Sequence, residues 1–119
     1  MDITFYDSEG EPVAYSDDGV HIFLFSGEPV AYLVNESVYS FSGNHLGFFS
    51  NGWIRDHDGD AVFFSENSIG GPMKPLKKLK PLKSLKELIP LKGLKELRPL
   101  KPLDSFLWSS LSVEELFDL

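Results

Sequence analysis

The chain of 119 residues has a net charge of −7, contains no cysteine and is 42% hydrophobic. The absence of cysteine excludes a disulfide framework and a thiolate metal centre, and no apolar run approaches the roughly 20 residues that a membrane-spanning helix needs. The N-terminus lacks the basic start and apolar stretch of a signal peptide, so we expect a cytoplasmic protein. This length predicts one compact domain with a tail.

The charge is divided between three blocks. Residues 1–73 carry twelve acids and one base, Arg55, whereas residues 74–103 carry ten bases and two acids, Glu87 and Glu96. Residues 104–119 carry four acids and no base. Such an asymmetry is typical of nucleic-acid or membrane contacts, or of recognition between segments. Because the acidic part is the larger one, we favour recognition between segments.

Residues 1–69 contain four copies of one pattern. Each copy has a glycine, an aliphatic residue three positions later and an aromatic residue five positions later. The four glycines, spaced by 17, 16 and 16 residues, are Gly10, Gly27, Gly43 and Gly59. An apolar strand precedes each glycine, and Asp-Gly and Asn-Gly pairs provide the positive φ that tight β-turns need. Each copy is therefore predicted to be a β-hairpin.

A single hairpin of this size cannot bury an apolar face, but four hairpins around an axis can. A propeller blade needs about four strands, and 16 residues hold only two. We therefore predict an all-β domain at 1–69, with four repeated β-hairpins and about eight short strands around a pseudo-four-fold axis. Such a small β domain is marginally stable alone, so we expect support from the tail or from another chain.

Residues 70–103 follow with a period of three, in which leucine occupies each third position from Leu76 to Leu103. Lys or Arg stands two residues before every leucine except Leu91, where Ile89 replaces it. This period would scatter the leucines around an α-helix and would send them to alternate faces of a strand. Five prolines in this segment, Pro75, Pro81, Pro90, Pro99 and Pro102, disfavour a helix further. We predict an extended polyproline-II-like Lys-x-Leu segment; a hexapeptide solenoid and a disordered basic linker are the alternatives.

One edge of such an extended segment would carry leucines and another would carry bases. A row of exposed leucines indicates a partner surface, so we expect the leucines to pack in a groove. The bases are predicted to bind the acidic domain of the same chain or of a sister subunit in a homo-oligomer. The candidate binding residues are Lys74, Lys77, Lys80, Lys83, Lys86, Lys92, Lys95, Arg98 and Lys101. A different protein partner stays open, and so does an anionic surface, either nucleic acid or lipid.

Residues 104–119 are predicted to dock on the body of the protein through apolar side chains that include Phe106, Trp108 and Leu116. Ser112 and Glu115 have the spacing of a capping box, which predicts a short C-terminal helix.

Several of these runs resemble a known family. They include residues 27–32 (Gly-Glu-Pro-Val-Ala-Tyr), residues 51–59 (Asn-Gly-Trp-Ile-Arg-Asp-His-Asp-Gly), the triplet segment and residues 107–112 (Leu-Trp-Ser-Ser-Leu-Ser). Together they make the chain similar to the bacterial 4-fold beta flower proteins over nearly its whole length. The resemblance implies four β-hairpin petals around an axis and implies no activity.

The densest polar cluster contains Asp56, Asp58 and Asp60 at alternate positions. Three carboxylates could bind Ca²⁺, but the same residues form the fourth hairpin turn, and we expect no metal and no cofactor. A small metal-dependent hydrolase that uses Asp56, His57 and Asp58 is the weakest functional alternative.

Two further features of the acidic domain involve single residues. Arg55 is expected to pair with Asp56 or Asp58. The histidines His21 and His45 lie in other repeats than His57, and only the fold can bring them together. The chain therefore indicates a non-enzymatic structural or interaction module.

Overall fold

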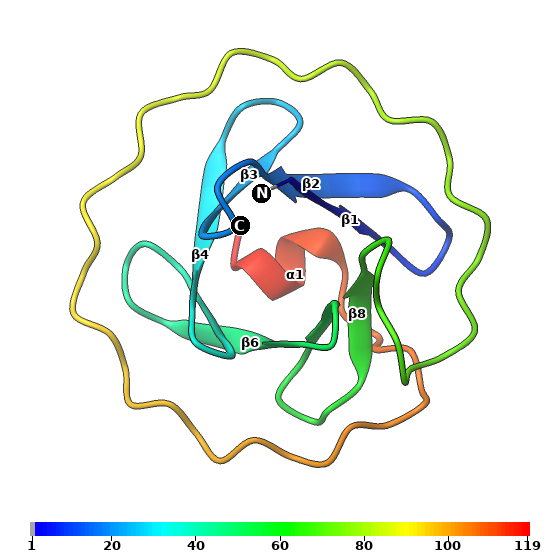
Figure 1. Cartoon of the computed structure of the whole chain (residues 1–119). Coiled ribbons are helices and arrows are strands. Elements are labelled where there is room, and N and C mark those ends of the chain that lie inside the picture. Colours follow the sequence, from blue (N-terminus) through cyan, green and yellow to red (C-terminus); the bar gives the residue numbers. More distant parts are fainter. Residues whose placement is uncertain (1) are drawn as a thin grey trace.

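The computed structural model describes residues 2–119 and contains a closed barrel of eight antiparallel strands (Figure 1). The strands are β1 (Ile3–Tyr6), β2 (Pro12–Ser16), β3 (His21–Leu24), β4 (Pro29–Val34), β5 (Ser37–Tyr39), β6 (His45–Ser50), β7 (Trp53–Arg55) and β8 (Ala61–Phe64). A single helix, α1 (Val113–Phe117), follows in the described part of the chain. The predicted all-β fold with a short C-terminal helix is confirmed.

The four predicted hairpins are the pairs β1–β2, β3–β4, β5–β6 and β7–β8, which we call petals one to four. The register shifts at the same place in every petal, between the residues five and four positions before the turn glycine. Strands of neighbouring petals also pair. The pairing of β1 with β8 through one residue pair, Tyr6 and Phe64, closes the barrel. The closed ring leaves no strand without a neighbour, which removes the edge that would otherwise invite aggregation.

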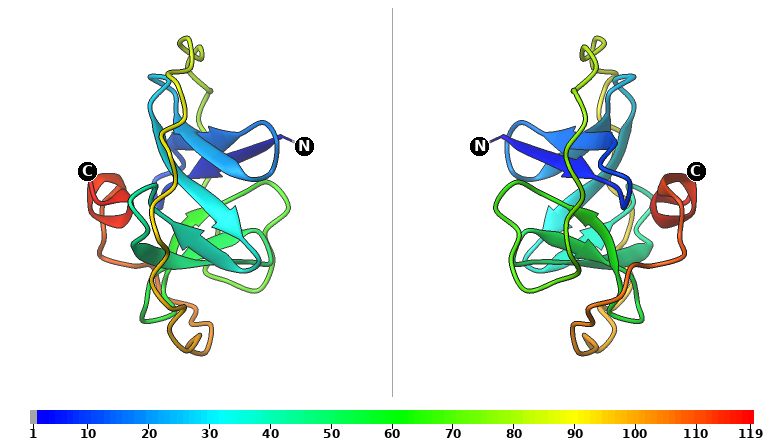
Figure 2. Two further views of the ribbon diagram at one scale, coloured as in Figure 1. Left: turned by 90° about the vertical axis from the view of Figure 1, so that its left-hand side faces the viewer. Right: turned by 90° about the vertical axis from the view of Figure 1, so that its right-hand side faces the viewer.

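The core of the barrel is filled by buried residues from all eight strands and from α1. Phe5, Ile22, Val38 and Ile54 come from the first strands of the petals and are fully buried. The helix covers one end of the barrel (Figure 2), where the Phe117 ring stacks on Phe63 with a centroid distance of 5.5 Å. Small residues at the positions equivalent to Phe63, namely Ala14, Ala31 and Gly47, leave the space that Leu116 and Phe117 occupy.

Helix α1 begins with the predicted capping box. The Ser112 hydroxyl accepts a hydrogen bond from the Glu115 N–H at 3.1 Å, and the Glu115 carboxylate accepts one from the Ser112 N–H at 2.9 Å. Leu116 and Phe117 dock as expected, but Phe106 does not, because 72% of its surface is exposed. Trp108 docks as expected, against the rings of Trp53 and Phe64.

Residues 74–103, called the belt below, contain no helix or strand and encircle the outside of the barrel (Figure 1). The side views place the belt around the middle of the barrel, between the N-terminus on one face and α1 on the other (Figure 2). The result is a disc with extents of 35 × 35 × 24 Å.

Candidate functional site: the contact between belt and barrel

The belt is attached to the barrel once per petal by the same backbone hydrogen bond. An N–H of the belt, or of the residues just after it, donates to the carbonyl of the turn glycine. The pairs are Lys78 with Gly10 (2.9 Å), Glu87 with Gly27 (2.9 Å), Glu96 with Gly43 (2.8 Å) and Ser105 with Gly59 (3.1 Å). The donors are nine residues apart, so three Lys-x-Leu triplets match one petal.

The turn glycines are required at these contacts for two reasons. Their φ values are positive, for example 95° at Gly27 and 104° at Gly43, in a region that disfavours other residues. A Cβ atom on Gly27 or Gly43 would also collide with the carbonyl oxygen of Leu85 or Leu94. The belt therefore lies against the petals through the backbone of its leucines.

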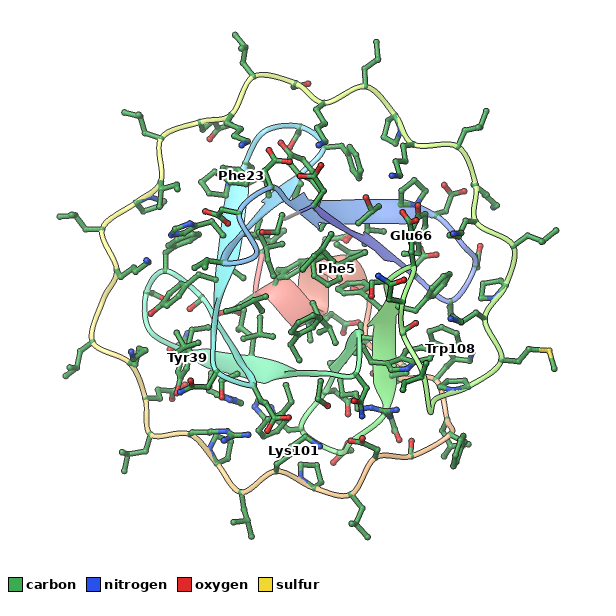
Figure 3. The ribbon with its side chains drawn as sticks, in the orientation of Figure 1. Phe5, Phe23, Tyr39, Glu66, Lys101 and Trp108 are labelled. Atoms are coloured by element: carbon green, nitrogen blue, oxygen red, sulfur yellow. The ribbon has the colours of Figure 1, made fainter. Side chains whose placement is uncertain are left out.

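The leucine side chains point away from the barrel. All ten belt leucines are between 91% and 97% exposed, and Figure 3 shows the outermost side chains of the belt directed into solvent. The expectation that the leucines pack in a groove is wrong for the chain's own barrel. The physical reason is that the carbonyls of four belt leucines face the turn glycines and turn their side chains outward, and the period of three places the other leucines on the same edge. The four are Leu76, Leu85, Leu94 and Leu103.

The basic edge of each triplet points inward instead and covers aromatic rings of the barrel. Two of these rings, Phe23 and Tyr39, are visible between barrel and belt in Figure 3. The cation-to-ring distances are 5.9 Å for Lys77 and Tyr6, 4.2 Å for Lys83 and Tyr15, 5.0 Å for Lys86 and Phe23, 4.7 Å for Lys92 and Tyr32, 5.9 Å for Lys95 and Tyr39, and 5.4 Å for Arg98 and Phe48. A cation over a ring contributes about 0.5–1 kcal/mol at an exposed site.

The positions of these rings follow a regular spacing in the sequence, although that spacing alone does not predict that they bind cations. An aromatic residue occurs five positions after each turn glycine, and in petals one to three another occurs four positions before it. The two series supply the rings on which the belt cations lie, so spacing relative to the glycines marks the cation-binding positions.

Carboxylates of the barrel add ion pairs around the belt. Asp17 contacts both Lys83 (3.1 Å) and Lys86 (2.6 Å), while Glu66 lies 3.5 Å from Lys80. The hydrogen bond from Lys86 is the main reason why the pKa of Asp17 is lowered, and the same contact raises the pKa of Lys86. These side chains are almost half exposed, so each pair contributes little to stability.

All nine candidate binding residues have partners within the described chain. The cations at both ends of the belt contact neighbouring segments: Lys74 donates to the carbonyl of Ser68 at 2.7 Å, and Lys101 donates to Asp104 at 2.9 Å. The remaining seven lie over the rings or beside the carboxylates already described.

Petal four replaces this arrangement with an exchange of charges. Asp104 stands nine residues after Lys95 and so continues the series Lys77, Lys86 and Lys95. Arg55 stands four positions before its turn glycine, where the other petals have Tyr6, Phe23 and Tyr39. The cation is now in the barrel and the partner is in the tail. The Nε atom of Arg55 lies 3.4 Å from Oδ1 of Asp104, so the expected pairing with Asp56 or Asp58 is wrong.

Arg55 joins the two ends of the belt. Its Nη1 donates to the carbonyls of Gly59 at 2.7 Å and Ser105 at 2.8 Å, and its Nη2 donates to the carbonyl of Gly70 at 3.2 Å. Gly70 precedes the belt and Ser105 follows it, so one buried guanidinium holds the entry and the exit of the ring. Arginine suits this position because its planar group directs several donors at once.

The acidic turn is accounted for by local hydrogen bonds. Carboxylate oxygens of Asp56, Asp58 and Asp60 lie within 4.8 Å of one another. Oδ1 of Asp56 accepts the N–H of Asp58 at 2.9 Å and that of Asp60 at 3.0 Å, which stabilises the turn. Asp7 makes the same two bonds in petal one, with the N–H groups of Glu9 and Glu11. The Asp56 carboxylate therefore caps its own turn, as Asp7 does in petal one.

The fold brings two of the three histidines together. Nδ1 of His45 lies 2.9 Å from Nε2 of His57, whereas His21 lies 2.7 Å from Asp18. Burial, together with the neighbouring His57, lowers the pKa of His45 to about 4.

A hollow of about 690 Å³ lies on the face away from α1, where Ile3, Phe49, Ser65 and Glu66 contribute to its lining. Its side chains include no histidine, and we assign no chemistry to it. Within residues 2–119, no helix is long and apolar enough to cross a bilayer.

Comparisons with known proteins agree with the petal architecture. Residues 3–117 match a family described as 4-fold beta flower protein. Comparisons with curated proteins and with solved structures gave no match. Because the match covers all four petals, the belt and α1, the chain belongs to the 4-fold beta flower protein family.

Proposed function

We propose that the protein is a non-enzymatic structural and interaction module whose basic belt docks on its own acidic barrel and displays leucines at the rim. The observation that carries this proposal is the orientation of the triplets. The cations cover the rings of Tyr15 and Phe23 and the carboxylate of Asp17, while the belt leucines are at least 91% exposed.

Docking of the belt is supported by contacts that recur around the whole barrel. The backbone hydrogen bond to the turn glycine occurs in all four petals, and opposite charges face each other across the contact. A small barrel has too little core for high stability by itself. The belt therefore acts as an outer layer that holds the petals together.

The rim is the outer edge of the belt, formed by its ten exposed leucines from Leu76 to Leu103. We propose that a second copy binds on this surface. Both end faces carry acids, with Glu114 and Asp118 at α1 on one face and Asp2 and Glu66 at the hollow on the other, so stacking of faces would bring like charges together. The rim alone combines apolar side chains with neutralised cations. A rim-to-rim contact uses the same leucines on both copies, as a two-fold dimer requires.

The alternative binding of nucleic acid or lipid is less well supported. Cations such as Lys83 and Lys86 already contact Asp17, and a polyanion would have to compete with that carboxylate. The hydrolase alternative is also weak, since Asp56 is occupied by two backbone N–H groups.

Light scattering on the full chain tests whether a second copy binds at the rim. The triple variant Leu82→Gln, Leu85→Gln, Leu88→Gln removes apolar surface at the rim and no contact with the barrel. We expect wild type to self-associate with rising concentration, and the variant to remain monomeric with an unchanged melting temperature. Wild type that stays monomeric at every concentration would refute the rim dimer.

Hydrogen exchange tests docking of the belt independently. The amides of Lys78, Glu87 and Glu96 should be protected, because they donate to turn glycines. The amides of Leu79 and Leu88, which make none of these bonds, are the internal controls. Equal, fast exchange at all five positions would show that the belt does not dock.

A further inference from the structure

His45 and His57 come from neighbouring petals and face each other beside the belt. His45 begins β6, and His57 lies in the turn between β7 and β8. Their nitrogens Nδ1 and Nε2 are 2.9 Å apart. A hollow of about 340 Å³ opens in front of the pair and is lined further by Glu96, Leu97 and Pro99 of the belt.

The buried histidine is oriented from behind. Nε2 of His45 lies 3.0 Å from Oγ of Ser37, which is itself buried. When Nε2 carries the hydrogen and donates it to Ser37, Nδ1 has a lone pair that points to His57. Histidines that bind metals are typically held in this way, with the second ring nitrogen donating to a neighbouring oxygen.

The separation of the two nitrogens fits a shared metal ion. Imidazole nitrogens bind Zn²⁺ at about 2.0–2.1 Å, and two bonds of that length at the right angle of a square-planar Cu²⁺ or Ni²⁺ site place their nitrogens about 2.9 Å apart. The ring centroids are 5.1 Å apart, so the two rings face each other nearly end to end across a hydrogen bond. A shared ion therefore requires the His57 side chain, which lies in an exposed turn, to rotate and to carry its hydrogen on Nδ1. Imidazole ligands suit Zn²⁺, Cu²⁺ and Ni²⁺.

We propose that Nδ1 of His45 and Nε2 of His57 bind one divalent ion of the Zn²⁺, Cu²⁺ or Ni²⁺ class, with water in the remaining positions. Within residues 2–119, no carboxylate or third histidine completes a cluster with this pair inside 4.8 Å. The site is therefore open, and its affinity is lower than that of a closed structural site. This inference does not depend on the proposed belt and rim functions.

The charges around the pair modulate this binding. Glu96 accepts the His45 N–H through Oε1 at 2.6 Å and adds a negative charge at the edge of the hollow. Arg98 lies over Phe48 and 3.7 Å from Glu36, and its positive charge opposes a bound cation.

Calorimetric titration of the full chain with Cu²⁺, with electron paramagnetic resonance of the complex, tests the site. We expect one equivalent to bind and the spectrum to show two nitrogen ligands. His57→Gln should abolish this binding, and the fold should persist because His57 lies in an exposed turn. The matched control His21→Gln should bind like wild type.

Ser37→Ala adds a second measurement. Loss of the hydroxyl behind His45 should weaken Cu²⁺ binding by about tenfold, as is typical when the partner of a metal-bound histidine is removed. No Cu²⁺ bound to wild type, or His57→Gln binding with wild-type affinity and spectrum, would overturn the proposal.

Discussion

Petals one to three and petal four attach the same belt by opposite means. In the first three petals, half-exposed lysines cover rings, as with Lys77 on Tyr6 and Lys86 on Phe23. In petal four a buried arginine of the barrel meets Asp104 and three backbone carbonyls. The first arrangement is repeated and weak at each position, whereas the second occurs once and satisfies groups at both ends of the belt. The difference indicates that three petals hold the belt and that the fourth closes it.

The largest expected effect comes from removing the closure. Arg55→Met removes the ion pair with Asp104 and leaves the carbonyls of Gly59, Gly70 and Ser105 without the guanidinium donors, and we expect a loss of about 3 kcal/mol in the free energy of unfolding. Urea denaturation measures this loss. Arg55→Lys is the control, because it keeps the charge but cannot reach all the acceptors. Its free energy of unfolding should lie between those of wild type and Arg55→Met. A loss below that of any single belt lysine would contradict the closing role of Arg55.

The next effect comes from separating the belt from one petal. Gly27→Ala introduces a Cβ at a positive φ and against the carbonyl of Leu85. We expect a destabilisation of about 2 kcal/mol, of which backbone strain accounts for about 1–2 kcal/mol, and faster exchange of the Glu87 amide.

Gly70→Ala is the matched control for this change. Gly70 also has a positive φ, of 75°, but a Cβ there meets nothing within 4 Å. It should therefore show the backbone strain without the loss of belt contact. Equal destabilisation by both variants would mean that the belt contact at Gly27 contributes nothing.

A smaller effect is expected at a single cation. Lys83→Met keeps an apolar chain over Tyr15 but removes the cation 4.2 Å from its ring centroid and the pair with Asp17. We expect a loss of about 0.5–1 kcal/mol, measured by thermal unfolding. Lys78→Met, which removes a cation paired with Glu11 and over no described ring, should have less effect. If the two variants behave alike, the ring contact is not a source of stability.

The smallest effect is a dependence on pH. Because the pKa of Asp17 is lowered in the folded protein, chiefly by Lys86, its contribution to stability is present above the unfolded pKa. That contribution is lost as pH falls through the folded pKa. Asp17→Asn should therefore reduce the acid-side slope of stability. An identical slope in wild type and Asp17→Asn would show that the ion pairs of Asp17 with Lys83 and Lys86 do not stabilise the docked belt.

The repeat and its turns were predictable because they are local. Glycine spacing, Asp-Gly and Asn-Gly pairs and the capping box of Ser112 and Glu115 each depend on residues close together in the chain, and all four petals and α1 are found where these signals place them. The charge division was also visible in the sequence, and the structure places the belt cations beside barrel carboxylates.

The errors concern directions and distant partners. Aspartates adjacent to Arg55 were the expected partners, but the side chain of Asp56 faces its own turn, and Asp104 arrives from 49 positions later in the chain. The meeting of His45 and His57 likewise depends on two neighbouring petals and has no signal in sequence spacing.

The sequence by itself determined that four hairpins would form and that a period of three would place leucines on one edge of the belt and bases on another. Periodicity defines which residues share an edge, but it contains no information about which edge faces the barrel. The tertiary structure decided that question, because the leucine carbonyls fill the space beside the turn glycines and the N–H groups two residues later donate to the glycine carbonyls. Backbone contact with residues that lack a side chain turned the bases inward and left the leucines at the rim.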